Sequence, residues 1–184
     1  MRAFIAIDLD PEIKETLQSL IRDLKTARAD IRWVSAEAMH LTLKFLGPID
    51  DSQALRVKDI LKDIATHHAP FPLRLEGTGA FPGEKSPRVL WVGFASGPEL
   101  PALQEEIEHS LEAEGFEREK RGFTPHLTVG RVKGQDRVAK AMAELDQRRG
   151  EAFGSMTVRK IALFESLLRP EGAEYRIVFE AGLG

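Results

Sequence analysis

The sequence predicts an α+β fold of two lobes around a central cleft, and three observations support this prediction. Short apolar runs typical of strands alternate along the chain with stretches of helical periodicity. The pattern His-x-Thr occurs once in each half, at His40 and at His126, inside similar apolar runs. The 184 residues are 42% hydrophobic, which is enough to bury a core, so we expect one bilobal domain over residues 1–184.

The first half reads as strands and helices separated by turn residues. Arg2 to Leu9 predicts a strand, after which Asp10 and Pro11 suit the N-cap and the first position of a helix. The apolar residues of this helix recur at helical spacing: Ile13, Leu17, Leu20, Ile21 and Leu24. We also expect strands at 31–34, 39–46 and 73–75, and a helix at 52–66 with Leu55, Ile60, Leu61 and Ile64 facing inward.

The second half repeats this order after the turn-rich segment PGEKSP. A strand is expected at 89–94, followed by a helix from about Leu100 to Leu111 that Gly115 closes as a C-cap. Next come a strand at 125–132, a helix over about 138–145, and strands at 157–164 and 175–179.

The two halves also align without gaps over their first parts. Positions 40 and 126 differ by 86, and the same offset carries Ile5 to Trp91, Leu17 to Leu103 and Ile21 to Ile107. We therefore expect an internal repeat, approximately 1–87 and 88–184, whose lobes are related by a pseudo-two-fold axis. Such an axis would place the two His-x-Thr strands opposite each other across the cleft.

Composition and charge restrict the class of protein. A formal net charge of −3 argues against a protein that coats long nucleic acid by charge alone, although a local basic pocket for the end of one strand remains compatible with it. The absence of cysteine excludes disulfides, thiolate nucleophiles and cysteine–zinc sites. We find neither a signal peptide at the start nor an apolar run long enough for a membrane span, and we expect a cytoplasmic protein.

Strand alternation decides which side chains of each motif share a face. His40, Thr42 and Lys44 are expected on one face of their strand, while the intervening apolar residues anchor the other face in the lobe. In the second copy His126 and Thr128 share a face. A single motif of this kind is most often a solvated strand edge, but two copies in the same phase favour a functional site.

Arg131 lies out of phase with His126, so it reaches the motif face only through a bulge or strand end near Gly130. Both Lys44 and Arg131 are candidates for neutralising phosphate, and solvated surface charge is the alternative for each.

Two histidines and two threonines, without a carboxylate in either motif, suit in-line displacement at phosphorus. Imidazole titrates near neutral pH, so one histidine can remove a proton from the attacking oxygen while the other protonates the leaving oxygen. The threonine hydroxyls can donate to the non-bridging oxygens as negative charge develops. This scheme requires no metal and no other cofactor.

On these residues the chain resembles the 2H phosphoesterase superfamily, and within it the RNA 2′,3′-cyclic phosphodiesterase branch historically called 2′-5′ RNA ligases. The matching segments are RAFIAIDL, RWVSAEAMHLTLKFLG, GAFPGEKSPRVLWVG, FTPHLTVGR and the closing strand pair. Together they cover nearly the whole chain, and none of the four motif positions departs from the family pattern.

The resemblance implies a bilobal α+β fold and hydrolysis of a 2′,3′-cyclic phosphate at an RNA end, or of a cyclic nucleotide, to a 2′-phosphate. It implies that His126 is the proton acceptor for water and that His40 is the proton donor for the 3′-oxygen. Thr42 and Thr128 would bind the phosphate, with Arg131 as a weaker candidate. We expect a monomer, since two lobes already complete the site.

Three other functions stay open at this point. The protein could join RNA ends as a 2′-5′ ligase, it could bind nucleotides or RNA ends without catalysis, or it could be a metal hydrolase with His40 and His126 as ligands. The intact histidine pair disfavours the second, and the lack of nearby carboxylates disfavours the third.

Some further residues have weaker claims. Lys120 and Arg121 precede His126 in a loop and are candidates for RNA phosphates, although a solvated loop is the more common case. Trp33, Phe45, Phe81 and Phe123 are candidates for stacking a terminal base, with core packing as the default for Phe45 and Phe81. We assign no catalytic role to His67, His68 or His109.

Overall fold

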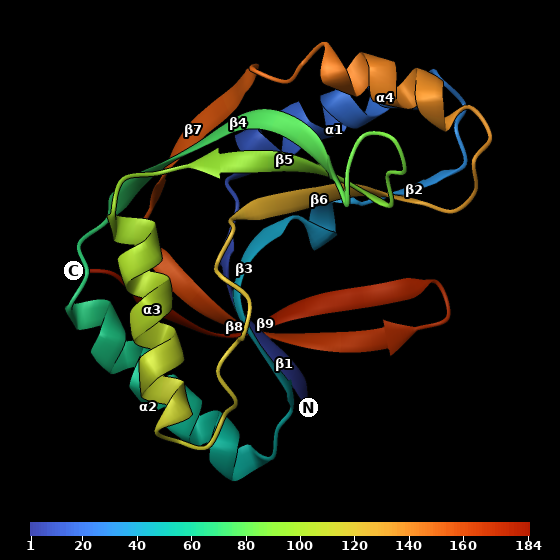
Figure 1. The fold of residues 1–184 in the computed structure, drawn as a ribbon. Helices are drawn as coiled ribbons and strands as arrows, with labels where there is room; N and C mark the ends of the chain where they lie inside the picture. Colours follow the sequence, from blue (N-terminus) through green and yellow to red (C-terminus); the bar gives the residue numbers. More distant parts are fainter.

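The fold consists of two antiparallel β-sheets, each covered by helices on one face (Figure 1). It is described here from a computed structural model that covers residues 1–184. The four-stranded sheet has the order β3-β1-β8-β9, with bounds β1 Arg2–Asp8, β3 His40–Pro48, β8 Lys160–Arg169 and β9 Gly172–Gly182. The five-stranded sheet has the order β2-β6-β5-β4-β7, with bounds β2 Ile31–Trp33, β4 Phe71–Phe81, β5 Val89–Ala95, β6 His126–Val132 and β7 Ala152–Val158. The predicted α+β class is confirmed.

The helices divide between the two sheets. Helices α1 (Pro11–Lys25) and α4 (Val138–Asp146) contact each other and pack on β7 and β4 of the five-stranded sheet. Helices α2 (Asp51–Thr66) and α3 (Glu99–Glu112) contact each other and pack on the four-stranded sheet. A short 3₁₀ helix, η1 (Ala36–Ala38), precedes β3. Figure 1 shows α1 and α4 on one side of the five-stranded sheet and the β8–β9 hairpin on the other.

The local signals explain most of these elements. Helix α1 begins with Pro11 at its first position and buries its five predicted apolar residues. Helix α2 begins with a capping box, in which Asp50 accepts from the Gln53 backbone N–H and the Gln53 side chain accepts from that of Asp50. Two details of the prediction are wrong. Leu55 is 62% exposed rather than inward, and the strand β7 was missed except for its last residues.

Each sheet takes strands from both halves of the chain. Strands β1 and β3 share a sheet with β8 and β9, whereas β5 and β6 share a sheet with β2 and β4. The offset of 86 residues carries β1 onto β5 and β3 onto β6, and the members of each pair hold equivalent places in the two sheets. The lobes are thus interleaved rather than consecutive, and the expected internal repeat stays a prediction.

The two faces of the four-stranded sheet have different roles. The face toward α2 and α3 contributes Ile5, Ile7 and Leu41 to the main core, where each buried apolar side chain contributes about 1.5–3 kcal/mol. The opposite face carries a separate small cluster of buried residues: Phe4, Ala6, Ala162 and Phe164. This helix-free face is the one on which His40 lies. None of the helices is long and apolar enough to cross a membrane.

Candidate active site

Both motif histidines stand at the first residue of a strand. His40 begins β3 and pairs with Asp8 of β1, while His126 begins β6 and pairs with Gly93 of β5. Although β3 and β6 belong to different sheets, they approach each other to within 8 Å between Cα atoms. The fold therefore brings the two motif strands together from opposite halves of the chain.

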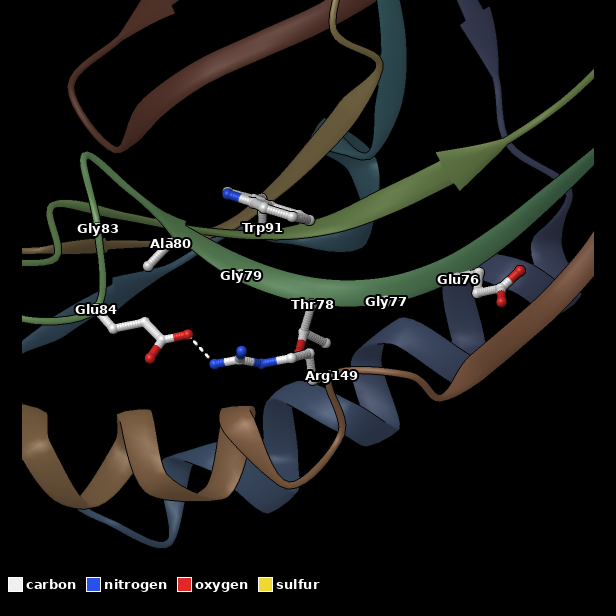
Figure 2. A pocket seen from close by; sticks show the side chains of 9 residues that line it. All are labelled: Glu76, Gly77, Thr78, Gly79, Ala80, Gly83, Glu84, Trp91 and Arg149. Carbon is white, nitrogen blue, oxygen red and sulfur yellow. Dashed lines mark hydrogen bonds and ion pairs between the residues drawn. The ribbon is translucent and has the colours of Figure 1, made fainter.

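Each motif threonine shares the face of its histidine. Thr42 pairs with Ala6, a member of the small cluster on the helix-free face of the four-stranded sheet. Thr128 pairs with Trp91, whose indole lies on the side of the five-stranded sheet away from the helices (Figure 2). The predicted sharing of faces by His and Thr holds in both strands.

Aromatic rings surround the His40 imidazole. Its ring is stacked on Phe4 at 4.7 Å and on Phe164 at 5.3 Å between centroids, and Tyr175 meets it edge-on at 5.0 Å. Ala6 and Ala162 pair with each other in the row between Phe4 and Asp8, and their side chains are only methyl groups, which leaves room for the rings above them. Sequence reasoning missed Phe164 and Tyr175, because only the pairing of β8 with β1 and of β9 with β8 brings them to the motif.

Burial in this aromatic surrounding lowers the pKa of His40 to about 4. The nearby charges act in opposite directions, since the Asp8 carboxylate raises this pKa and the Lys14 ammonium lowers it. Asp8 and Lys14 form an ion pair at 2.8 Å, so much of their influence on the imidazole cancels. Nδ1 of His40 is buried and has no hydrogen-bond partner within the protein. The free protein therefore holds His40 neutral at pH 7.

His126 has a different environment. Its Nδ1 lies 2.8 Å from the carbonyl oxygen of Thr124, which can only accept a hydrogen bond. Nδ1 therefore carries the proton and donates, so the lone pair of the neutral ring is on Nε2. Phe81 contacts the imidazole edge-on at 5.0 Å, and Trp91 lies 5.5 Å from Phe81.

Lys44 does not lie on the motif face, which corrects the prediction from strand alternation. The register shifts between Ala6 and Ile5, so that Leu43 is an extra residue in β3 and Lys44 pairs with the core residue Ile5. Lys44 is 5% exposed and donates to Glu108 at 2.7 Å and to the Glu117 carbonyl at 2.8 Å. It is a buried structural cation.

Arg131 lies on the same face of its sheet as the motif residues, because a β-bulge at Val129 reverses the alternation of β6. The register of β6 against β5 shifts after Thr128, so that Gly130 pairs with the core residue Leu90 and Arg131 pairs with Val89. Arg131 is exposed and forms no ion pair with a carboxylate. It is thus free to bind an anion.

The aromatic candidates separate into two groups. Phe45 is 74% exposed and Phe81 is 38% exposed, so the default expectation of core packing is wrong for both. Trp33 and Phe123 are partly buried against the main core. An exposed aromatic side chain near a histidine motif is suited to stacking on a base.

The remaining candidates lie apart from the motif strands. Lys120 and Arg121 are exposed in the loop before β6. His67 and His68, at the end of α2, each contact the Glu106 carboxylate at 2.6 Å. No group of three His, Cys, Asp or Glu side chains is arranged to hold a metal ion.

A surface hollow of about 490 Å³ also lies beside the five-stranded sheet, lined by Glu76, Gly77, Thr78, Gly79, Ala80, Gly83, Glu84, Trp91 and Arg149. Figure 2 shows Thr78 on the helix side of the sheet, with Arg149 bound to Glu84. The hollow contains no motif residue, so we do not identify it with the active site.

The sequence profile of the 2′-5′ RNA ligase superfamily matches residues 9–169. Two relatives named RNA 2′,3′-cyclic phosphodiesterase are similar over nearly their full length. That of Archaeoglobus fulgidus is 36% identical, covering 96% of this chain and 97% of its own, and that of Methanothermobacter thermautotrophicus is 34% identical, covering 95% of both. The relative of the same name from Aquifex aeolicus is 35% identical and covers 100% and 98%.

Solved structures agree with these relatives. The protein TT0787 of Thermus thermophilus is 28% identical, has a TM-score of 0.81, and covers 100% of this chain and 98% of its own. E. coli LigT complexed with 3′-AMP is 26% identical, has a TM-score of 0.78, and covers 99% and 97%. The likeness therefore extends over the whole chain in both sequence and fold.

Proposed function

We propose that this chain, which belongs to the 2′-5′ RNA ligase superfamily, hydrolyses RNA 2′,3′-cyclic phosphate ends to 2′-phosphomonoesters. It is a cyclic phosphodiesterase, as its full-length relatives are named. The observation that carries the chemistry is the pair of His-x-Thr strands, each beginning on its histidine and approaching the other between the two sheets. The ligase and the non-catalytic alternatives are not favoured by these relatives.

In the proposed reaction His126 is the proton acceptor. The Thr124 carbonyl holds the proton of the neutral ring on Nδ1, so Nε2 has the lone pair that a general base needs. Nε2 removes a proton from water as the water oxygen forms a bond to phosphorus. The bond between phosphorus and the 3′-oxygen then breaks, which leaves the phosphate on the 2′-oxygen.

His40 is the proton donor to the departing 3′-oxygen. Its pKa of about 4 in the free protein means that it acquires the proton only after an anion binds next to it. A phosphodiester beside the ring supplies that negative charge, which favours the imidazolium and raises the pKa. Substrate binding and protonation of His40 are thereby coupled. The aromatic rings around the imidazole keep it neutral when no substrate is bound.

Thr42 and Thr128 donate their hydroxyl protons to the non-bridging oxygens as charge develops on them. Arg131, which the bulge in β6 turns to the same face, adds a cation for phosphate. No metal ion or other cofactor takes part in these steps. We further propose that the protein acts as a cytoplasmic monomer, because one chain supplies both motifs.

The test is incubation with a nucleoside 2′,3′-cyclic phosphate in the presence of a chelator, followed by chromatographic identification of the product. We expect the nucleoside 2′-phosphate to accumulate at an undiminished rate. Formation of the 3′-phosphate would reverse the identity of the leaving group, and activity lost to the chelator would contradict the two-histidine scheme.

A further inference from the structure

Two arginines lie directly opposite each other on neighbouring strands without a carboxylate between them. Arg32 of β2 pairs with Arg131 of β6, and both side chains are exposed. Neither guanidinium has a carboxylate oxygen within 4.0 Å. Like charges at directly opposite positions of a sheet are destabilising, so this pair is suited to an anion that neutralises both.

The pair lies on the same face of the five-stranded sheet as His126. Arg131 pairs with Val89 of β5, and Val89 pairs with Phe81 of β4, so these side chains form one row across the sheet. The ring of Phe81 at the end of this row contacts the His126 imidazole. The two guanidinium groups and the catalytic base therefore share one surface.

Local packing fixes the direction of Arg32. Ile31 and Trp33 pack against the main core on either side of it, so strand alternation turns Arg32 to the opposite face. Gly130 permits this packing, because a Cβ there would lie 2.8 Å from Cγ2 of Ile31 and 2.9 Å from Cε3 of Trp33. Any larger residue at position 130 would displace the strand that carries Arg32.

The guanidinium of Arg32 also extends toward the four-stranded sheet. A Cβ on Gly172, at the turn of the β8–β9 hairpin, would lie 3.4 Å from Nη2 of Arg32. Figure 1 shows this hairpin on the side of β2 and β6 away from α1 and α4. The Arg32 guanidinium thus lies close to the β8–β9 turn of the four-stranded sheet.

The position of Arg32 on the edge strand β2 separates it from the reacting phosphate, whereas Arg131 is on the motif strand β6. Arg131 follows Thr128 by three residues, which is at most about 10 Å along a strand. Arg131 is therefore within reach of a phosphate bound by Thr128 and the two histidines, whereas Arg32, one strand farther away, is placed for the neighbouring phosphodiester of the same RNA strand.

We propose that Arg32 and Arg131 form a second anion site, which binds the phosphodiester on the 5′ side of the terminal nucleotide. This inference rests on the proposed function and names its substrate class: the enzyme acts on RNA ends in preference to cyclic mononucleotides, since a mononucleotide has no group for this site. Arg131 contributes to both phosphates from its position in β6, whereas Arg32 serves the second one.

The experiment compares kcat/KM for adenosine 2′,3′-cyclic phosphate with that for the dinucleotide ApA ending in the same cyclic phosphate. Arg32→Gln should lower kcat/KM for the dinucleotide by about 10-fold or more, as expected for loss of a charged hydrogen bond, and should change the mononucleotide less than about 2-fold, which is within the range of a surface substitution. Arg22→Gln is the matched control. It removes an equal charge from an exposed position on α1 and should affect the turnover of neither substrate.

A third substrate separates the contribution of the internal phosphodiester charge from that of the additional nucleobase. A dinucleotide whose internal linkage is an uncharged methylphosphonate should behave like the mononucleotide and should be insensitive to Arg32→Gln. Equal losses on the mononucleotide and the dinucleotide, or no loss on either, would overturn the second site while leaving the proposed hydrolysis intact. If the unsubstituted enzyme turned over none of these substrates, both proposals would fail.

Discussion

The two motif strands have the same sequence pattern and the same local irregularity, but they place their histidines in opposite surroundings. His40 is stacked against two aromatic rings and has a buried Nδ1 without a partner. His126 donates its Nδ1 proton to a backbone carbonyl. The comparison shows how one motif, used twice, can provide an imidazole that resists protonation in the free protein and another that is fixed as a base.

Each motif strand also contains a β-bulge, and the two bulges lie at equivalent positions. Leu43 is the extra residue in β3 and Val129 is the extra residue in β6, and these positions differ by the same 86 residues that separate the motif histidines. In each strand the bulge reverses the phase of the residues beyond it. Phe45 and Arg131 consequently turn to the helix-free faces, one as an exposed ring and the other as an exposed cation.

Removing either histidine tests whether both surroundings are needed. His126→Ala and His40→Ala should each lower kcat by about 10²–10⁴-fold, because each removes one proton-transfer group of a coupled pair. Steady-state kinetics on a cyclic nucleotide measures this, with circular dichroism melting to verify the fold. A near-unchanged rate in either variant would remove that histidine from the mechanism.

The bulge in β3 turns Lys44 into the core, where it forms an ion pair with Glu108. Removing this ion pair tests how much it contributes to stability. Lys44→Met leaves Glu108 as an uncompensated charge in the core, and it should lower the free energy of unfolding by about 3–5 kcal/mol. Urea denaturation gives the value. The double variant Lys44→Met with Glu108→Leu should regain most of the loss, since it removes both charges. A single variant as stable as the parent would mean that the ion pair is not buried as described.

The threonines should matter less than the histidines. Thr42→Ala and Thr128→Ala should each reduce kcat by about 10–10³-fold, by analogy with the loss of one oxyanion donor. Thr78→Ala is a useful control, because its buried hydroxyl donates to the Leu145 carbonyl on the helix side and has no place in the mechanism. Equal activity losses in all three variants would indicate a general effect of destabilisation.

The smallest expected effect concerns the ion pair beside His40. Lys14→Met should raise the pKa of His40 above about 4, because the ammonium lowers it, and Asp8→Asn should lower the pKa further, because the carboxylate raises it. NMR titration of the imidazole protons measures both shifts. Since the folded-state pKa lies below the ordinary value of 6.5, protonation favours the unfolded state. Stability should therefore fall as the pH decreases from about 6.5 toward 4. Unchanged titration in both variants would exclude these charges as an influence on His40.

Strand and helix periodicity was sufficient to predict the fold class, the order of most elements and the shared faces of the motif residues. It failed at Lys44, because a bulge depends on the register between β3 and β1, which strand alternation alone does not reveal. The same limitation hid Phe164 and Tyr175, which reach His40 only through sheet pairing. At Arg131 the glycine before it indicated where a bulge was possible, and the structure has a bulge at the neighbouring Val129.

The most direct test of the central claim is a crystal structure of the complex with a nucleoside 2′-phosphate. The proposal predicts that Nε2 of His126 and a ring nitrogen of His40 each lie about 2.6–3.2 Å from oxygens of the same phosphate, the distance required for proton transfer. A phosphate that contacts only one of the two imidazoles, or neither, would contradict the account.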